Sequence, residues 1–368
     1  MIDAVADPVL VLDGERDPQP PAAPATRPPT ARRIAALAIG LTVILVAALM
    51  VARSRHDAGP TSVPALPVLG PAHDVYDGDL GDPFVLGVTG AGGRIDSYVA
   101  FGTGDWPARV PTASSTDLQT WRQGGDALPD LPAWAGADPK NSLSWAPAAL
   151  QTDRGFILYV TLPDAASGQQ CIGAATSAVA QGPYTGVGDG PLLCQHDLGG
   201  SIDPALVRDG TGQLHLLWKN DGNSVGAASS LWEQRLTADG LGVTGVAHRL
   251  LGASLPWQGG IVEEPAMVPA TGGGWWLYYS GNFFDRPEYA TGLAYCPTIE
   301  GPCRDVSDQA VLATPALAQD HQFAPGGLDT FLDSQGRRWA VFDTWNRPTR
   351  NGRFYCCRSL QLAEVLSA

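Results

Sequence analysis

Hydrophobic residues occur in short runs along most of the chain, and polar turns separate these runs. Five of the runs are rich in β-branched and aromatic residues and are bounded by Gly, Asp or Ser: SYVAFGTG, GFILYVTL, QLHLLWKN, GWWLYYSG and RWAVFDTW. Runs of this length and composition predict strands rather than helices. The 44 glycines and 31 prolines also favour many turns over long helices. We therefore expect an all-β domain.

These strands belong to a repeat. Each run follows a first apolar run by about ten residues, and the first runs are DPFVLGV, APAAL, DPALVRD, EPAMVPA and GGLDTFLDS. The result is five units of roughly sixty residues, somewhat longer than common propeller repeats of about 40 to 50 residues. Radial repetition of four-stranded sheets accommodates such a series best. The predicted fold is a five-bladed β-propeller over residues 76–368.

The N-terminal part of the chain has a different pattern. Residues 1–33 are acidic and proline-rich, which predicts a disordered cytoplasmic tail. The uncharged run from Ile34 to Ala52, as a helix, covers about 28 Å and can span a bilayer core. Residues 53–75 are rich in Pro, Ala and Gly and predict an extended linker. Flanking arginines favour a cytoplasmic N-terminus. This predicts a single-pass protein of the cell membrane with its propeller outside the cytoplasm, a cleavable signal peptide being the alternative.

Cysteine usage agrees with export of the propeller. All six cysteines follow the apolar run, and none shows the paired spacing of a structural zinc site. Cys296 and Cys303 bracket a short turn and can close it, and Cys171 can pair with Cys194. Buried free thiols are the alternative.

The net charge excludes some partners. The chain carries a formal charge of −14 and has two lysines, Lys140 and Lys219. A basic patch for nucleic acid or for an anionic membrane surface is therefore not expected. Neutral sugars tolerate this charge.

Acidic residues precede proline at the start of three predicted blades: Asp82-Pro83, Asp203-Pro204 and Glu264-Pro265, with Glu263 beside the last pair. An acidic residue before proline often only begins a turn. In a propeller, however, the first strands of the blades surround the central axis, so these carboxyl groups meet at one end of the channel. Paired carboxyl groups are what hydrolysis of a glycosidic bond requires. The pattern therefore indicates a glycosidase.

The same residues carry a family resemblance. Asp82-Pro83, Trp145-Ala146-Pro147, Ile202-Asp203-Pro204 and Glu263-Glu264-Pro265, with STDLQTW at 115–121, LTADGLGVTG at 236–245 and YYSGN at 278–282, resemble glycoside hydrolase family 43 across nearly all of residues 80–362. The resemblance implies a five-bladed propeller that acts, mostly with inversion, on arabinofuranosides, arabinans or β-xylosides.

The resemblance also implies roles for individual residues. Asp82 is then the general base, and Asp203 tunes the pKa of the acid and orients it. Glu263 is the general acid because the family places its acid two residues before proline. Simple register between blades favours Glu264 instead. Since adjacent strand residues face opposite sides, we expect only one of the two glutamates in the pocket and choose Glu263.

One departure from the family concerns its central metal. Family members commonly carry a histidine near the start of blade five, where it often helps bind calcium, but this chain has Pro325-Gly326-Gly327 there. His321 lies a few residues upstream and is the alternative ligand. We expect no required cofactor, and a calcium ion stays an open alternative.

Three further residues are candidates for binding an oligo- or polysaccharide. Trp145 precedes the second blade's Ala-Pro pair and can stack on a sugar ring. Asn282 and Arg347 follow strand ends and can bond sugar hydroxyls.

The predicted function is therefore a membrane-anchored glycosidase that cleaves arabinofuranosyl or xylosyl-type linkages with inversion. Two alternatives remain at this point. One is a related propeller glycosidase or phosphorylase for another sugar, and the other is an inactive, membrane-tethered carbohydrate-binding propeller.

Overall fold

The computed structural model describes residues 64–76, 78–104, 107–136, 144–314, 322–347, 349, 351–354 and 357–367. They belong to one compact unit, Val63–Ala368. The predicted tail, the apolar run Ile34 to Ala52 and residues 53–63 of the linker lie outside the described residues. Within the described ranges, no helix is both long enough and apolar enough to span a bilayer.

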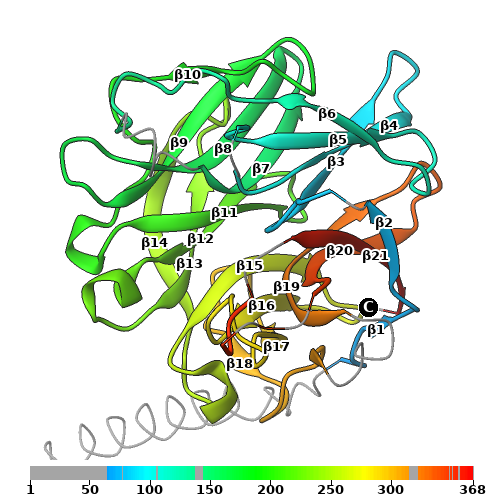
Figure 1. Ribbon diagram of the computed structural model, residues 1–368, viewed down its shortest axis with the longest axis vertical. Helices are drawn as coiled ribbons and strands as arrows, with labels where there is room; N and C mark the ends of the chain where they lie inside the picture. Colours follow the sequence, from blue (N-terminus) through cyan, green and yellow to red (C-terminus); the bar gives the residue numbers. More distant parts are fainter. Residues whose placement is uncertain are drawn as a thin grey trace, which may run out of the picture. The chain divides into compact units, whose positions relative to one another are not determined.

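Five antiparallel sheets form the fold, which confirms the predicted five-bladed propeller (Figure 1). Blade one contains β3 (Phe84–Thr89), β4 (Ile95–Phe101), β5 (Pro111–Ser115) and β6 (Arg122–Asp126). Blade two contains β7 (Trp145–Thr152), β8 (Gly155–Pro163), β9 (Gln170–Ser177) and β10 (Thr185–Val187). Blade three contains β11 (Ser201–Arg208), β12 (Leu214–Asn220), β13 (Ser230–Leu236) and β14 (Val243–Gly252). Blade four contains β15 (Val262–Pro269), β16 (Trp275–Gly281), β17 (Ala290–Cys296) and β18 (Arg304–Asp305).

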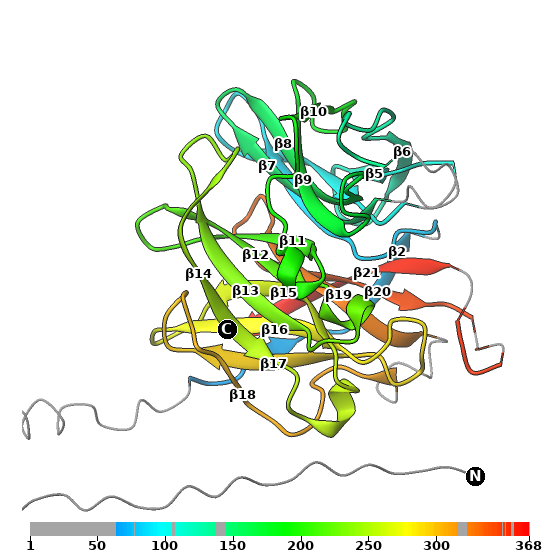
Figure 2. The same cartoon turned by 90° about the vertical axis from the view of Figure 1, so that its left-hand side faces the viewer.

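Blade five closes the ring with both ends of the described chain. Its strands are β19 (Phe323–Leu332), β20 (Arg338–Trp345) and β21 (Arg358–Ser367), and β1 (Val68–Leu69) and β2 (His73–Tyr76) both pair with β21. Figure 2 shows β2 beside β21. The linker predicted to extend to residue 75 therefore ends earlier, because Val68–Tyr76 supplies backbone hydrogen bonds to the edge of β21. This pairing covers an edge that would otherwise be open.

The first strands of the five blades surround the axis. The strands β3, β7, β11, β15 and β19 contact one another in chain order, and β19 contacts β3. The aromatic runs recognised in the sequence form the second strands, β4, β8, β12, β16 and β20. The start of each first strand therefore lies at the axis, as predicted.

The hydrophobic core is divided among the blade interfaces. Five main clusters of buried side chains occur, and each joins two adjacent blades. For example, Val99 of β4 and Leu158 of β8 belong to the cluster between blades one and two. Alternating strand residues point to the two neighbouring blades, which is why second strands such as β12 are buried along their whole length.

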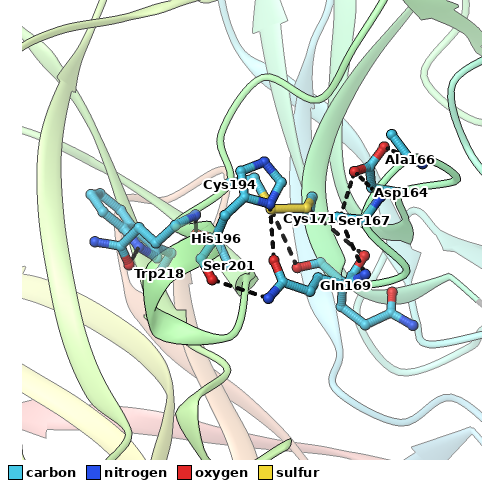
Figure 3. Close-up of a disulfide and its surroundings, with 11 residues drawn as sticks. Asp164, Ala166, Ser167, Gln169, Cys171, Cys194, His196, Ser201 and Trp218 are labelled. Atoms are coloured by element: carbon cyan, nitrogen blue, oxygen red, sulfur yellow. Dashed lines mark hydrogen bonds between the residues drawn. A yellow bond between two sulfur atoms is a disulfide. The ribbon is translucent and has the colours of Figure 1, made fainter. Parts of the chain in front are cut away.

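Both predicted disulfides are formed, Cys171–Cys194 and Cys296–Cys303, and Cys357 is disulfide-bonded as well. Figure 3 shows Cys171–Cys194 joining β9 to the loop that enters β11. In this loop the Gln195 backbone N–H donates to Ser201 Oγ at 3.0 Å, and Trp218 Nε1 donates to the Gln195 side chain at 2.8 Å. The disulfide thus holds the segment that leads into Asp203.

Candidate active site

A shared backbone feature builds the axis of the propeller. In every blade the residue before the proline of the first strand has a positive φ: Asp82 (49°), Ala146 (39°), Asp203 (57°), Glu264 (52°) and Ala324 (50°). Non-glycine residues rarely adopt this conformation, and it costs on the order of 1–3 kcal/mol at each position. Register shifts interrupt the pairing of β7, β11, β15 and β19 at the same place. The bulged strands turn these residues towards the centre.

A cavity of about 540 Å³ lies at this end of the channel. It is lined by Asp82, Thr103, Trp145, Ile202, Asp203, Lys219, Asp221, Asn223, Ser224, Glu263, Glu264, Phe284 and Arg358. The structure therefore brings together Asp82, Asp203, Glu263 and Trp145, four of the six predicted site residues.

Asp82 is held as an ionised carboxylate. Arg358 donates to both of its oxygens, from Nη1 to Oδ1 and from Nη2 to Oδ2 at 3.1 Å, and the Thr103 hydroxyl also donates to Oδ2. Burial by itself raises the pKa of Asp82, but the charge of Arg358 and these hydrogen bonds outweigh it and lower the pKa to about 2. Asp82 can therefore accept a proton but has none to give at neutral pH.

A second carboxyl group, that of Asp343, contacts the backbone of Asp82. Asp343 Oδ2 accepts the backbone N–H of Asp82 at 2.7 Å and lies 3.2 Å from Arg358 Nη1. Burial raises the pKa of Asp343 to about 7, against the opposing charge of Arg358. Arg358 thus binds two carboxyl groups and orients the one that faces the cavity.

Asp203 behaves differently from Asp82. Its side chain is 7% exposed and its Oδ2 accepts the backbone N–H of Glu264 at 3.1 Å. Burial, followed by the charges of Glu263 and Asp82, raises the pKa of Asp203 to about 8, although Lys219 opposes the shift. Burial thus favours the protonated form of Asp203.

Glu263 lies at the more open side of the cavity, with its side chain 15% exposed. Its Oε2 is 2.8 Å from Lys219 Nζ, and its Oε1 is 2.8 Å from the hydroxyl of Tyr289. Lys219 is 1% exposed and is also 3.9 Å from Asp221. Lys219 therefore pairs with the Glu263 oxygen that Tyr289 does not contact.

Glu264 lies at the axis. Its Oε2 is 2.8 Å from Ser280 Oγ, 2.7 Å from the Tyr289 hydroxyl and 2.7 Å from the backbone nitrogen of Gly327. Burial, followed by the charge of Asp82, raises the pKa of Glu264 well above its ordinary value. Burial therefore favours the protonated form of Glu264.

The prediction that only one of the two glutamates faces the pocket is wrong. Glu263 and Glu264 both line the cavity, and both contact Tyr289. Strict alternation of side chains requires regular extended backbone, and β15 lacks it here because its pairing shifts between Glu263 and Ala266. The positive φ of Glu264 accompanies this bulge.

Two predicted binding residues do not line the cavity. Asn282 Nδ2 donates to the Trp257 carbonyl at 2.9 Å, and Asn282 Oδ1 accepts the Phe283 backbone N–H at 3.0 Å. Its side chain is therefore used to fix its own loop. Arg347 is exposed and is not among the residues around the cavity.

Lys219, Phe284 and Arg358 are among the cavity residues that were not predicted as site residues from the sequence. Phe284 stacks on Trp345 with ring centroids 6.4 Å apart, and the Arg358 guanidinium lies 5.9 Å from the Phe284 ring. Lys219 is the penultimate residue of the predicted strand QLHLLWKN, and its position near the end of β12 was a usable signal. No sequence signal related Arg358 to Asp82.

The residues around Gly327 do not fit the family's calcium ion. Glycine supplies no side-chain ligand, and its backbone N–H, like the hydroxyl of Ser280, points to the Glu264 oxygen that a cation would need. His321 lies outside the described residues. Among the described residues, the group with metal-ligand spacing is Cys171, Cys194 and His196, and its two sulfur atoms are bonded to each other.

A five-bladed propeller with several carboxyl groups around one end of its axis defines a class of carbohydrate-active enzyme, and comparison with known proteins gives the family. The model of glycosyl hydrolases family 43 matches residues 74–365. The chain belongs to this family and is a glycosidase.

Solved structures share the fold. A thermostable family-43 glycoside hydrolase has 20% identity and a TM-score of 0.65, over 83% of this chain and 91% of that one. An endo-1,4-beta-xylanase from Bacteroides thetaiotaomicron has 21% identity and a TM-score of 0.62, over 79% and 92%. An alpha-L-arabinofuranosidase from Lactobacillus brevis has 16% identity and a TM-score of 0.61, over 77% and 90%. A search of curated protein sequences found no match.

Proposed function

We propose that this glycosidase hydrolyses arabinofuranosyl or xylosyl-type linkages of a neutral saccharide, with inversion at the anomeric carbon. The observation that carries the proposal is that one cavity joins an ionised carboxylate, Asp82, with a second carboxyl group, that of Glu263, which lies on its more open side. Arabinofuranosidase and xylanase structures of the same fold support the choice of sugar.

Asp82 is the proposed base. It is ionised at neutral pH, and Arg358 and Thr103 fix its orientation. An attacking water gives one proton to this carboxylate while its oxygen bonds to the anomeric carbon. An inverting enzyme needs about 6.5–9.5 Å between the base and the acid to admit that water.

Glu263 is the proposed acid. Of the two adjacent glutamates, it lies on the open side of the cavity, whereas the Glu264 oxygen Oε2 is occupied by three neighbours. When Glu263 has passed its proton to the leaving oxygen, the ammonium of Lys219 stabilises the carboxylate that remains. Asp203 contributes by binding the backbone N–H of Glu264, which fixes the bulge that carries both glutamates.

The charges of the cavity favour a neutral substrate. Its two cationic side chains, among the described residues, are both committed to carboxylates: Arg358 to Asp82 and Lys219 to Glu263. Neither is available for a phosphate or a uronate. This arrangement argues against the phosphorylase alternative, which needs a basic phosphate site.

Aromatic side chains on two sides of the cavity provide surfaces for sugar rings. Trp145 belongs to blade two, and Phe284 lies on the loop after β16 in blade four. Stacking of an aromatic face on the apolar face of a sugar positions the ring without a charge. We propose that both residues bind substrate.

We also propose that the run from Ile34 to Ala52 anchors the enzyme in the cell membrane, with the propeller outside the cytoplasm. The uncharged length of that run and its flanking arginines support the proposal. The disulfides of the propeller support an oxidising compartment. Alkaline extraction of membranes, with protease protection of either end, tests the anchor and its orientation.

The decisive test of the activity is hydrolysis by the full chain in detergent. The panel contains arabinofuranosyl, xylosyl and galactofuranosyl substrates, and proton NMR follows the configuration of the first product. Inverted arabinose or xylose, formed by the wild type and lost in Asp82→Asn and Glu263→Gln, supports the proposal. Retained configuration contradicts the mechanism. A folded protein that binds these sugars without turnover is instead a binding module.

A further inference from the structure

The hydroxyl of Tyr289 lies between the two glutamates of the cavity. It is 2.8 Å from Glu263 Oε1 and 2.7 Å from Glu264 Oε2. Tyr289 precedes β17, and its side chain is 2% exposed. A phenolic hydroxyl has one proton and can donate only one hydrogen bond along its O–H. One of the two contacts therefore needs a proton from a carboxyl group.

Whenever Glu263 is ionised, that proton belongs to Glu264. Lys219 neutralises Glu263 directly at 2.8 Å, whereas the cation nearest to the axis, Arg358, is committed to Asp82 and Asp343. An ionised Glu264 beside Asp82 would place two like charges together in a buried site. The raised pKa of Glu264 agrees with this assignment.

Glu264 also reaches Asp82 on its other side, because the two carboxyl groups are hydrogen-bonded to each other. Four side chains therefore form one chain of hydrogen bonds across the axis, which runs from Asp82 through Glu264 and Tyr289 to Glu263. It begins at the proposed base and ends at the proposed acid.

Two glycines of blade five make room for this chain. A methyl group at Gly326 would meet the Tyr289 ring at 2.0 Å, and a methyl group at Gly327 would meet the Asp82 Cα at 3.0 Å and Glu264 Oε1 at 3.4 Å. Gly327 has a φ of +61°. The glycines found in place of the family's histidine thus allow Tyr289 and Glu264 to meet at the axis.

Hydrolysis with inversion leaves the two ends of this chain in the wrong protonation states. The base has gained a proton from water, and the acid has lost its proton to the leaving oxygen. Before the next turnover, one proton must leave Asp82 and one must reach Glu263.

We propose that Glu264 and Tyr289 return the proton from Asp82 to Glu263 within the protein, so that the site resets itself after each hydrolysis. This inference rests on the proposed function of Asp82 and Glu263. Asp82 O–H gives its proton to Glu264 Oε1, Glu264 Oε2–H gives its proton to the Tyr289 oxygen, and Tyr289 O–H gives its proton to Glu263 Oε1. Each group in between gains one proton and loses one.

The chain has a complete set of hydrogen bonds before and after this shift. Three protons serve the three contacts in both states, and only the direction of donation reverses. Tyr289 stays neutral throughout, in agreement with its pKa, which burial and the nearby carboxylates raise well above the ordinary value. The other ionisable groups that face the chain are Asp203, Lys219 and Arg358.

Tyr289→Phe removes the central link and keeps the ring. We expect a single turnover with excess enzyme to keep the wild-type rate, and kcat under multiple turnover to fall by about tenfold or more. Small weak acids in the buffer should restore part of the loss. Glu264→Gln should show the same loss of kcat under multiple turnover, because a neutral amide does not relay protons. Tyr278→Phe is the matched control, since it removes a buried hydroxyl of the same blade that has no partner.

Two kinetic results overturn the proposal. One is an unchanged kcat in Tyr289→Phe. The other is an equal loss in single and multiple turnover without rescue by weak acids, which shows that Tyr289 only positions Glu263. Thermal unfolding of each variant separates both results from misfolding.

Infrared spectroscopy tests, without any substrate, whether Glu264 carries a proton. The wild type at pH 7 should show the carbonyl stretch of a protonated carboxylic acid that Glu264→Gln loses and Tyr289→Phe shifts. Absence of that band difference overturns the proposal even if the enzyme is active. If no glycoside is hydrolysed while the band is present, the proposed function fails and the shared proton stands.

Discussion

The guanidinium of Arg358 binds the carboxylate of Asp82, although 276 positions separate the two residues in the chain. Asp82 precedes the first strand of blade one, and Arg358 begins β21 in blade five. Closure of the propeller brings them together. The same contact that joins the last blade to the first therefore also fixes the proposed base.

Replacement of Arg358 by lysine keeps the charge but loses the two-pronged contact. We expect kcat/KM to fall by on the order of 10²-fold. Because Arg358 lowers the pKa of Asp82, the acid limb of the pH profile of kcat/KM should move to higher pH. Arg353→Lys, which changes an exposed arginine paired with Asp285, is the control. An acid limb that stays in place would show that Arg358 does not set the ionisation of the base.

Phe284→Ala should weaken substrate binding. Removal of one stacking surface costs roughly 1 kcal/mol, so KM for an oligosaccharide should rise about fivefold to tenfold, with a smaller change in kcat. Phe283→Ala is the matched control, because Phe283 is similarly exposed, at 52% against 51%, and does not line the cavity. Equal effects of the two substitutions would remove Phe284 from the binding site.

Gly327→Ala should cost both stability and activity. The positive φ penalises any side chain by about 1 kcal/mol, and the added methyl group presses on Asp82. Gly336→Ala provides the comparison, since Gly336 has a φ of +79° and open space around its Cα. Chemical unfolding should show a loss in both variants. Initial rates should fall in Gly327→Ala alone, and normal rates there would argue against close packing at the axis.

The two disulfides should differ in their effect on catalysis. Loop-closure entropy predicts about 3 kcal/mol for Cys171–Cys194 and about 2.5 kcal/mol for Cys296–Cys303, which close separations of 23 and 7 residues. The double variant Cys171→Ala/Cys194→Ala should also lose activity, because it frees the loop that enters β11. Cys296→Ala/Cys303→Ala is expected to stay fully active below its melting temperature. Equal residual activity of both variants would contradict the link to Asp203.

Stability should fall as pH rises from about 4 to 8. Asp203 and Asp343 have folded-state pKa values of about 8 and about 7, above the value of about 3.9 expected for an unfolded chain. The folded protein binds more protons in this window, so its stabilising contribution is complete below pH 4 and is lost as pH passes the folded-state values. Melting temperatures at pH 5 and pH 8 measure the effect. Asp203→Asn should flatten the dependence, and an unchanged slope would contradict the raised pKa.

Much of the fold follows from local pattern. The aromatic runs predict the second strands, and the proline-containing runs predict the first strands, because both signals lie within single segments. Asp82, Asp203 and Trp145 reach the cavity for the same reason. The repeat itself places equivalent positions at one axis.

Other parts of the site depend on features that the alternation of side chains along a strand does not reveal. The bulge that brings Glu263 and Glu264 into one cavity requires a positive φ before proline, a conformation that ordinary propensities disfavour. Arg358 and Asp82 meet only through ring closure. Asn282 was predicted to bind sugar, but its side chain bonds to backbone groups, and Phe284 of the same loop lines the cavity instead.

The pairing of β1 and β2 with β21 has a mechanical consequence. A pull on the N-terminal segment acts first on the backbone hydrogen bonds that hold Val68–Leu69 and His73–Tyr76 to the last strand. That strand begins with Arg358, the partner of Asp82. If the enzyme is anchored as proposed, tension on the tether would thus be transmitted to the residue that orients the proposed base.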